Sequence, residues 1–317
     1  MRVVRVACVA VAAVVLATGS AEGQVPWPGL PTPILPPDPT VPYLPAVKPV
    51  KCISGKPACV QQLATELQRR TNALGCSHDA VFSDAYLTIT RAIGAAGATP
   101  GFFDRPDRVR HEARTYAQAY LDQFDRWHAG KRTSVSPSWQ IAFRAARRQS
   151  VTALGDLMLA LNAHIRRDNP IRAVEQTEGV LRVRGPMPAA SGKPDHERVN
   201  TVLANSMHVM LKRLAQRYDP TLDDNPPLFG TVIDPKSLYS IIQLWREESW
   251  RNAEQLRHAR AHGGVNGPLY RAKLAEIEAA AKAGALAILQ ATRTDRAHNA
   301  ARNRYCRRQL RASRAAR

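Results

Sequence analysis

The sequence predicts an all-α fold: a single multi-helix domain of about eight or nine helices, preceded by a Pro-rich extended segment. Apolar residues recur three and four positions apart through most of the chain after residue 57, which is the period of an amphipathic helix. No run of alternating β-branched residues, which would favour strands, competes with this pattern. Short segments rich in Gly and Pro separate the periodic runs, so we expect the helices to pack against one another around one core.

Residues 1–23 have the layout of a secretory signal peptide. Arg2 and Arg5 precede an apolar run at residues 6–17, and mostly small residues follow up to Gly23. The run is too short to remain as a transmembrane helix, and no later segment reaches the ~18 continuous apolar residues that a span needs. We therefore expect cleavage near Gly23 and a secreted or cell-envelope-associated protein with no integral membrane span. A retained N-terminal anchor is the alternative.

Residues 24–51 form a Pro-rich linker. Ten prolines lie between Val25 and Val50. Proline fixes φ and removes the backbone donor that helices and sheets use, so this segment is expected to be extended and to lie outside any core. Its predicted role is that of a spacer, and binding to a groove-type domain is the alternative role.

Nine runs with a helical period follow, and the all-helical domain is expected to span residues 52–262. The runs are residues 58–74, 80–93, 107–127, 138–148, 151–167, 170–181, 195–218, 235–261 and 268–293. The pair Asn169-Pro170 separates two of them. Asparagine is a favoured helix cap and proline fits the first position of a helix, so the pair is interpreted as the start of a new helix. Residues 263–317 are expected to hold the C-terminal helix and an arginine-rich tail.

Four cysteines remain once the signal peptide, which contains Cys8, is removed: Cys52, Cys59, Cys76 and Cys306. An even number of cysteines in an oxidising compartment predicts disulfides. We favour Cys52 with Cys59, which closes a short loop, and Cys76 with Cys306, which ties the C-terminal region to the body of the domain. A zinc site is the rival interpretation, but the paired CxxC spacing that is typical of zinc sites is absent from the sequence.

The formal net charge of +19 is concentrated toward the C-terminal end. Residues 291–317 carry nine arginines and a single acidic residue, Asp295. A solvated tail of this charge attracts polyanions, so the expected partners are anionic cell-envelope polymers or anionic lipid. No helix-turn-helix, zinc-finger or aromatic RNA-binding signature accompanies the arginines, so specific binding of nucleic acid is not expected.

Two polar residues stand at the end of an apolar helix face in the segment LNAHIRRDNP. At 3.6 residues per turn, His164 and Asp168 continue the stripe of leucines that begins at Leu154. A buried imidazole and a buried carboxylate both need hydrogen-bond partners. His164 and Asp168 are therefore expected either to satisfy each other, one turn apart, or to form a functional site.

Five segments in a fixed order carry a resemblance to a known family. They are AYLTIT (85–90), GFFDRPDRVRHEARTYAQAYLDQF (101–124), PSWQIAFRAA (137–146), LNAHIRRDNP (161–170) and DHERVN (195–200). Together they resemble a bacterial family known as domain-of-unknown-function family 5995. The resemblance covers about residues 58–260 and implies a helical fold without an established activity. The matched His164 and Asp168 are in place, whereas Asn169-Pro170 stands where the family pattern has a leucine.

The resemblance and the placement of His164 together suggest a divalent metal site. His164 and Asp168 can ligate a metal from one face of a helix, and Asp195 with Asn200 on a later helix would complete an oxygen-rich set. Two further polar residues on an earlier helix are expected to support the ligands by hydrogen bonds: Tyr86 and Thr90. A metal held in this way would lower the pKa of a bound water and so support hydrolysis.

Two functions of different classes follow from these observations. The first is a secreted structural or binding protein of the cell envelope, whose polar cluster holds helices together while the basic tail and the Pro-rich arm reach partners. The alternative is a metal-assisted hydrolase centred on His164 and Asp168. The sequence contains no GxSxG, P-loop or GxGxxG motif, so it lacks the signatures of the common serine hydrolases, phosphate-binding loops and dinucleotide-binding folds.

Overall fold

The computed structural model describes residues 55–179, 192–223, 227–228 and 231–315. Its α-helices are α2 (Pro57–Leu74), α3 (Ala80–Ala98), α4 (Pro106–His128), α5 (Pro137–Arg148), α6 (Ala153–Asn162), α7 (Asn169–Gly179), α8 (Lys193–Arg217), α9 (Pro235–Gly263), α10 (Pro268–Ala291) and α11 (Arg296–Ala315). The shorter elements are η1 (Arg132–Ser134), η2 (Ala163–Asp168), η4 (Pro220–Leu222) and the antiparallel strands β1 (Pro227–Leu228) and β2 (Thr231–Val232).

The predicted all-α fold is confirmed over the described residues. α6, η2 and α7 run on from one another as a single continuous helix, so the described part of the chain has nine helices. The predicted signal peptide, the Pro-rich linker and Cys52 lie outside the described residues. No helix in the described ranges is both long enough and apolar enough to cross a membrane.

Prolines mark most of the helix starts, as the sequence suggests. The helices that have proline at their first position are α2, α4, α5, α9 and α10, and α8 has Pro194 at its second. Proline is well suited to these positions because its fixed φ is helical and its missing N–H would have no partner inside the helix. The helix starts are thus encoded locally.

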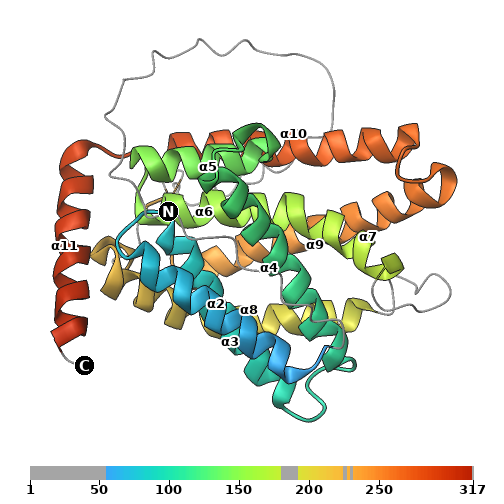
Figure 1. The fold of residues 1–317 in the computed structure, drawn as a ribbon, viewed down its shortest axis with the longest axis horizontal. Helices are drawn as coiled ribbons and strands as arrows, with labels where there is room; N and C mark the ends of the chain where they lie inside the picture. The colour runs from blue at the N-terminus through green and yellow to red at the C-terminus, as the bar shows by residue number, and fades with distance from the viewer. Residues whose placement is uncertain (1–54, 180–191, 224–226, 229–230, 316–317) are drawn as a thin grey trace, which may run out of the picture.

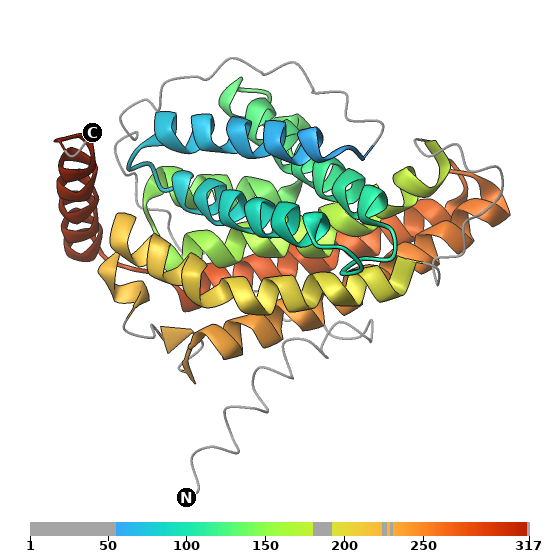
Figure 2. The same ribbon diagram turned by 90° about the horizontal axis from the view of Figure 1, so that it is seen from below.

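The helices form two packed groups (Figures 1 and 2). In one group, α3 packs between α2 and α8, and α4 contacts both α2 and α3. In the other group, α10 packs against α5, α6 and α9. The two groups also contact each other directly, α8 with α9 and α3 with α6, and the segment η2 lies between them, in contact with α4 of the first and with α9 and α10 of the second. Trp139 of α5 and Leu157 of α6 are fully buried in the core that the groups share.

The pair Asn169-Pro170 does not separate two helices, contrary to the sequence-based interpretation. Asn169 has helical backbone angles, with φ −61° and ψ −46°. Inside an α-helix, proline lacks a donor and its ring clashes with the carbonyl four residues earlier. Here the preceding turn is a π-helix, in which the Asn169 N–H donates to the carbonyl of His164, five residues back. The wider π turn relieves the proline clash and allows the helix to continue.

The arginine-rich C-terminal segment is a docked helix rather than the solvated tail that the sequence suggested. α11 stands at one end of the molecule, apart from the two packed groups (Figures 1 and 2). One face of α11 is held against the domain, because Asn299, Arg302 and Cys306 are buried at a helical spacing. The opposite face is solvent-exposed and carries arginines: Arg304, Arg307, Arg308, Arg311 and Arg314.

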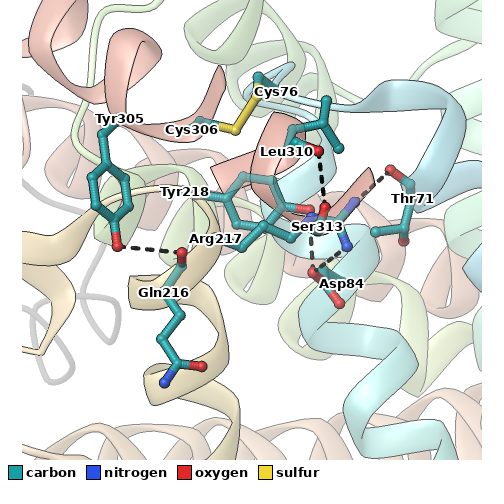
Figure 3. The surroundings of a disulfide bond; sticks show 10 residues. All are labelled: Thr71, Cys76, Asp84, Gln216, Arg217, Tyr218, Tyr305, Cys306, Leu310 and Ser313. Atoms are coloured by element: carbon teal, nitrogen blue, oxygen red, sulfur yellow. Dashed lines mark hydrogen bonds and ion pairs between the residues drawn. A yellow bond between two sulfur atoms is a disulfide. The ribbon is translucent and has the colours of Figure 1, made fainter. Parts of the chain in front are cut away.

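The predicted disulfide between Cys76 and Cys306 is confirmed and links α11 to the segment between α2 and α3 (Figure 3). Beside it, the Tyr305 hydroxyl donates to the carbonyl of Gln216 at 3.2 Å. Cross-linking positions so far apart in the sequence restricts the unfolded chain strongly and stabilises the folded domain by an amount on the order of 2–4 kcal/mol. α11 is therefore fixed both covalently and by hydrogen bonds.

Candidate functional site

His164 is buried in η2 against aromatic rings of α3. Its ring centroid lies 4.9 Å from that of Tyr86 and 5.8 Å from that of Phe82. Burial, and to a lesser extent the charge of Arg246, lower the pKa of His164 to about 3, so the imidazole is neutral at neutral pH. Its Nδ1 atom is buried and has no hydrogen-bond partner among the described residues.

Asp168 does not pair with His164. One carboxylate oxygen accepts a hydrogen bond from Trp139 Nε1 at 2.7 Å, and the other accepts one from Arg167 at 2.7 Å. Arg167 also pairs with Glu278 of α10 at 3.0 Å. Burial raises the pKa of Asp168, and the Arg167 charge opposes that rise. Asp168 therefore fastens the π-helical segment to α5 rather than to the histidine.

Asp195 and Asn200, the other oxygen ligands expected from the sequence, have separate roles. The Asp195 carboxylate accepts hydrogen bonds at 2.8 Å from the backbone N–H groups of Asp104 and Arg105, and so it closes the loop before α4. Asn200 instead accepts a hydrogen bond from Arg246 Nε at 2.7 Å. Asp195 thus holds the loop before α4 from the first turn of α8, while Asn200 orients an arginine.

No metal-binding group of three or more His, Cys, Asp or Glu side chains exists in the part of the chain that the structure describes. The set expected from the sequence, His164 with Asp168 and Asp195, is not assembled, because each of the two carboxylates is held by its own N–H donors. The metal-assisted hydrolase therefore has no ligand set among these residues.

A cavity of about 90 Å³ lies where α3, α4, η2, α8 and α9 meet. Its walls are mainly apolar, and the larger apolar side chains are Phe82, Ile89, Ile93, Leu161, Ile165, Leu203, Met207, Met210 and Ile242. Polar side chains also line it: Tyr86, Thr90, Glu112, Tyr116, His164, Asn169, His196 and Arg246. Of the residues expected from the sequence, His164, Tyr86 and Thr90 come together here, whereas Asp168 and Asp195 do not.

Arg246 of α9 is a buried cation held by neutral groups. Its Nε donates to Asn200, and one terminal nitrogen donates to the carbonyl of His196 at 2.8 Å and to His196 Nδ1 at 3.2 Å. No carboxylate of the described chain lies within ion-pair distance of this guanidinium. Burial lowers the pKa of Arg246, and the nearby Tyr116 and Glu112 oppose that effect.

Glu112 is the acidic side chain of the cavity wall, and it already has a cationic partner. It accepts a hydrogen bond from Arg108 Nε at 2.9 Å. Burial raises the pKa of Glu112, whereas the Arg108 charge lowers it. Because the Arg108–Glu112 pair is close to neutral, the charge of Arg246 is left uncompensated at the cavity.

The hydrogen bond from Arg246 also fixes the tautomer of His196. A guanidinium only donates, so His196 Nδ1 must accept and the ring proton must lie on Nε2. Burial lowers the pKa of His196 well below its usual range, which keeps the ring neutral. Nε2 is buried without a hydrogen-bond partner in the described ranges. It is therefore an unused N–H donor beside the cavity.

The tyrosines of the wall keep their protons. Burial raises the pKa of Tyr86 and of Tyr116 far above the usual value. Both hydroxyls therefore remain neutral and can donate a hydrogen bond into the cavity. Asn169, which the sequence suggested as a helix cap, lies on the wall as well, and its Oδ1 atom is buried and lacks a partner among the described residues.

Arg246 is not singled out by the sequence-based predictions, although the spacing of apolar residues in α9 contains a signal for it. Leu238, Ile242 and Arg246 follow one another at intervals of four residues in α9, and all three are buried. A charged residue thus occupies the core-facing stripe of an amphipathic helix. For Tyr116 and His196, the sequence gives no comparable signal, because their roles depend on contacts between helices distant along the chain.

A family model described as "Family of unknown function (DUF5995)" matches residues 60–291, which include every residue of the cavity wall. No curated protein matches the chain, and no solved structure does so either.

Proposed function

Because the chain belongs to the family of unknown function DUF5995, we propose a function from the cavity itself: the helical domain binds a compact, mainly apolar molecule that carries a polar head group. The observation that carries this proposal is the presence of unpartnered polar atoms in an apolar cavity. They are His164 Nδ1, Asn169 Oδ1 and His196 Nε2. Buried polar atoms in folded proteins nearly always have hydrogen-bond partners, so three without partners at one cavity point to a bound molecule.

The energetics support the same conclusion. Each buried polar atom without a partner costs about 1–3 kcal/mol. A cavity of about 90 Å³ that stays empty costs about 2 kcal/mol more, at ~24 cal/mol per Å³. A ligand that fills the space and pairs with some of these atoms would offset part of both costs.

The size of the cavity limits the ligand. A cavity of ~150 Å³ holds benzene in a well-studied protein, so about 90 Å³ has room for roughly four non-hydrogen atoms, the size of an isobutyl group. The apolar walls favour a branched or short aliphatic group. The polar atoms favour a head group that can form several hydrogen bonds at once.

The proposed setting of this activity is the cell envelope or the exterior of the cell. Residues 1–23 support export, and the Cys76–Cys306 disulfide supports an oxidising compartment. The exposed arginines of α11 support contact with anionic envelope polymers or lipid. Fractionation of the native host, with N-terminal sequencing of the recovered chain, tests this setting. A cytoplasmic chain that retains residues 1–23 would exclude it.

Calorimetric titration with three probes that share an isobutyl group tests the binding function. The probes are 3-methylbutanol, 3-methylbutanamide and 3-methylbutanoate. At least one should bind the native protein, and Ala113→Leu, which fills part of the cavity, should weaken that binding at least ten-fold. The matched control is Ala204→Leu, on the solvent-exposed face of α8, which should bind as the native protein does. If no probe binds the native protein, the proposal is wrong.

A further inference from the structure

The charges of the side chains that line the cavity indicate the charge of the ligand's head group. Arg246 is buried, lines the cavity and donates only to neutral groups. Burying a cation costs several kcal/mol unless an anion accompanies it. Several other buried arginines in the described part of the chain have that anion: Arg70 pairs with Asp125, Arg166 with Glu248, and Arg302 with Asp156. Arg246 is a buried arginine whose carboxylate is missing.

The acids nearest to Arg246 do not supply that carboxylate. Glu112 faces it from α4 but is bonded to Arg108, and Glu197 on α8 accepts a hydrogen bond from Asn200 and pairs with Lys193. The histidines facing the cavity, His164 and His196, are neutral and contribute no charge. The cavity wall is therefore left with one uncompensated positive charge.

The donor groups of Arg246 and His196 both belong to the lining of the cavity. The guanidinium of Arg246 is fixed by Asn200 and by the His196 carbonyl, so it cannot turn away. The same guanidinium forces the ring proton of His196 onto Nε2, where it has no acceptor. The fixed, charged donor of Arg246 matches an anion, because hydrogen bonds between an ionised donor and an ionised acceptor are the strong ones.

We propose that the ligand is a small aliphatic carboxylic acid bound as its carboxylate. This inference rests on the proposed binding function. The carboxylate accepts hydrogen bonds from Arg246, and the aliphatic part lies among Ile89, Leu203 and Met207. The ligand thereby supplies the anion that α9 lacks. Asn200 is a positioning residue, because it orients Arg246.

The matched pair 3-methylbutanoate and 3-methylbutanamide tests this inference, since the two molecules differ mainly in the charge of the head group. Titration of the native protein at pH 7 should show the carboxylate binding at least ten-fold more tightly than the amide. Arg246→Met should abolish this preference while changing the affinity for the amide less than three-fold. Arg251→Met, on the exposed face of the same helix, is the matched control and should leave the preference unchanged.

A second variant covers the case in which Arg246→Met fails to fold. His196→Phe keeps a ring against Trp250 but removes the Nδ1 acceptor that helps to hold Arg246 in place, and it should weaken carboxylate binding several-fold. Equal affinity of the native protein for the acid and the amide would overturn the carboxylate assignment and leave the binding function intact. Absence of binding by every probe would overturn both.

Discussion

Arg302 and Arg246 are both buried arginines, but their surroundings differ. Arg302 reaches from α11 to the Asp156 carboxylate at 2.8 Å and to His78 Nδ1 at 2.9 Å, and the nearby disulfide holds its helix in place. Arg246 has only neutral partners and lies at a cavity. A buried arginine that is paired with a carboxylate stabilises the fold. A buried arginine that lines a cavity and has no carboxylate partner can bind an anionic ligand.

The cavities near the two arginines also differ, in volume and in polarity. A cavity of about 20 Å³ adjoins His78 and Asp156, and it has room for roughly one water molecule. Such a water can pair with His78 Nε2 and Asp156 Oδ1, the two atoms there that lack partners among the described residues. The cavity at Arg246 is several times larger and mainly apolar, so a single water molecule would leave most of its volume empty.

The largest change in the free energy of unfolding is expected for substitution of Arg302. Arg302→Met leaves the buried Asp156 carboxylate without its cation, and breaking a buried ion pair in this way costs about 3–5 kcal/mol. Urea unfolding measures the loss of free energy. Arg304→Met, on the exposed face of the same helix, is the matched control and should change stability by no more than about 0.5 kcal/mol. Equal effects of the two variants would mean that α11 is not an integral part of the fold.

A smaller loss of folding stability is expected when the pH is lowered, and it arises from His164 at the cavity. The pKa of His164 is lowered to about 3 in the folded protein, against about 6.5 in the unfolded chain. As the pH falls below 6.5, the unfolded state takes up the proton first, so stability is lost progressively between pH 6.5 and about 3. The expected loss is about 1.4 kcal/mol per pH unit, or about 2 kcal/mol at pH 5.

Unfolding of the native protein and of His164→Phe at pH 7 and pH 5 measures this contribution. The phenylalanine variant does not titrate at this position, so its loss of stability between the two pH values should be smaller by about 2 kcal/mol. His208→Phe, at an exposed position of α8, is the matched control and should keep the full loss. An unchanged pH dependence in His164→Phe would show that the imidazole is not held neutral.

The sequence predicts the positions of the helices better than the contacts between them, because helices depend on local spacing and the contacts do not. Helices and their proline starts depend on local spacing, so the period of apolar residues locates them. The same spacing brings His164, Tyr86 and Thr90 to the interior. The partner of Asp168 is a tryptophan on another helix, and no local pattern encodes a contact between residues 29 positions apart.

Two errors of the sequence-based description have the same origin. The pair Asn169-Pro170 follows the rule for a helix start, but packing of η2 against α4, α5, α9 and α10 holds the helix continuous and the π turn accommodates the proline. The abundance of arginine made α11 resemble a solvated tail, although Asn299, Arg302 and Cys306 already have the spacing of a buried helix face. In both places, tertiary contacts decide what local chemistry leaves undetermined.

The smallest effect on stability is expected for Arg246→Met. The substitution leaves the acceptors on Asn200 and His196 without their donor, which is unfavourable, but it also removes a buried charge that has no counter-ion, which is favourable. Because these effects oppose each other and methionine fills much of the same space, we expect a net change of about 1 kcal/mol or less in urea unfolding of the ligand-free protein. A loss as large as that of Arg302→Met would contradict the distinction between the two arginines, since Arg246 would then be as necessary to the fold as a buried ion pair.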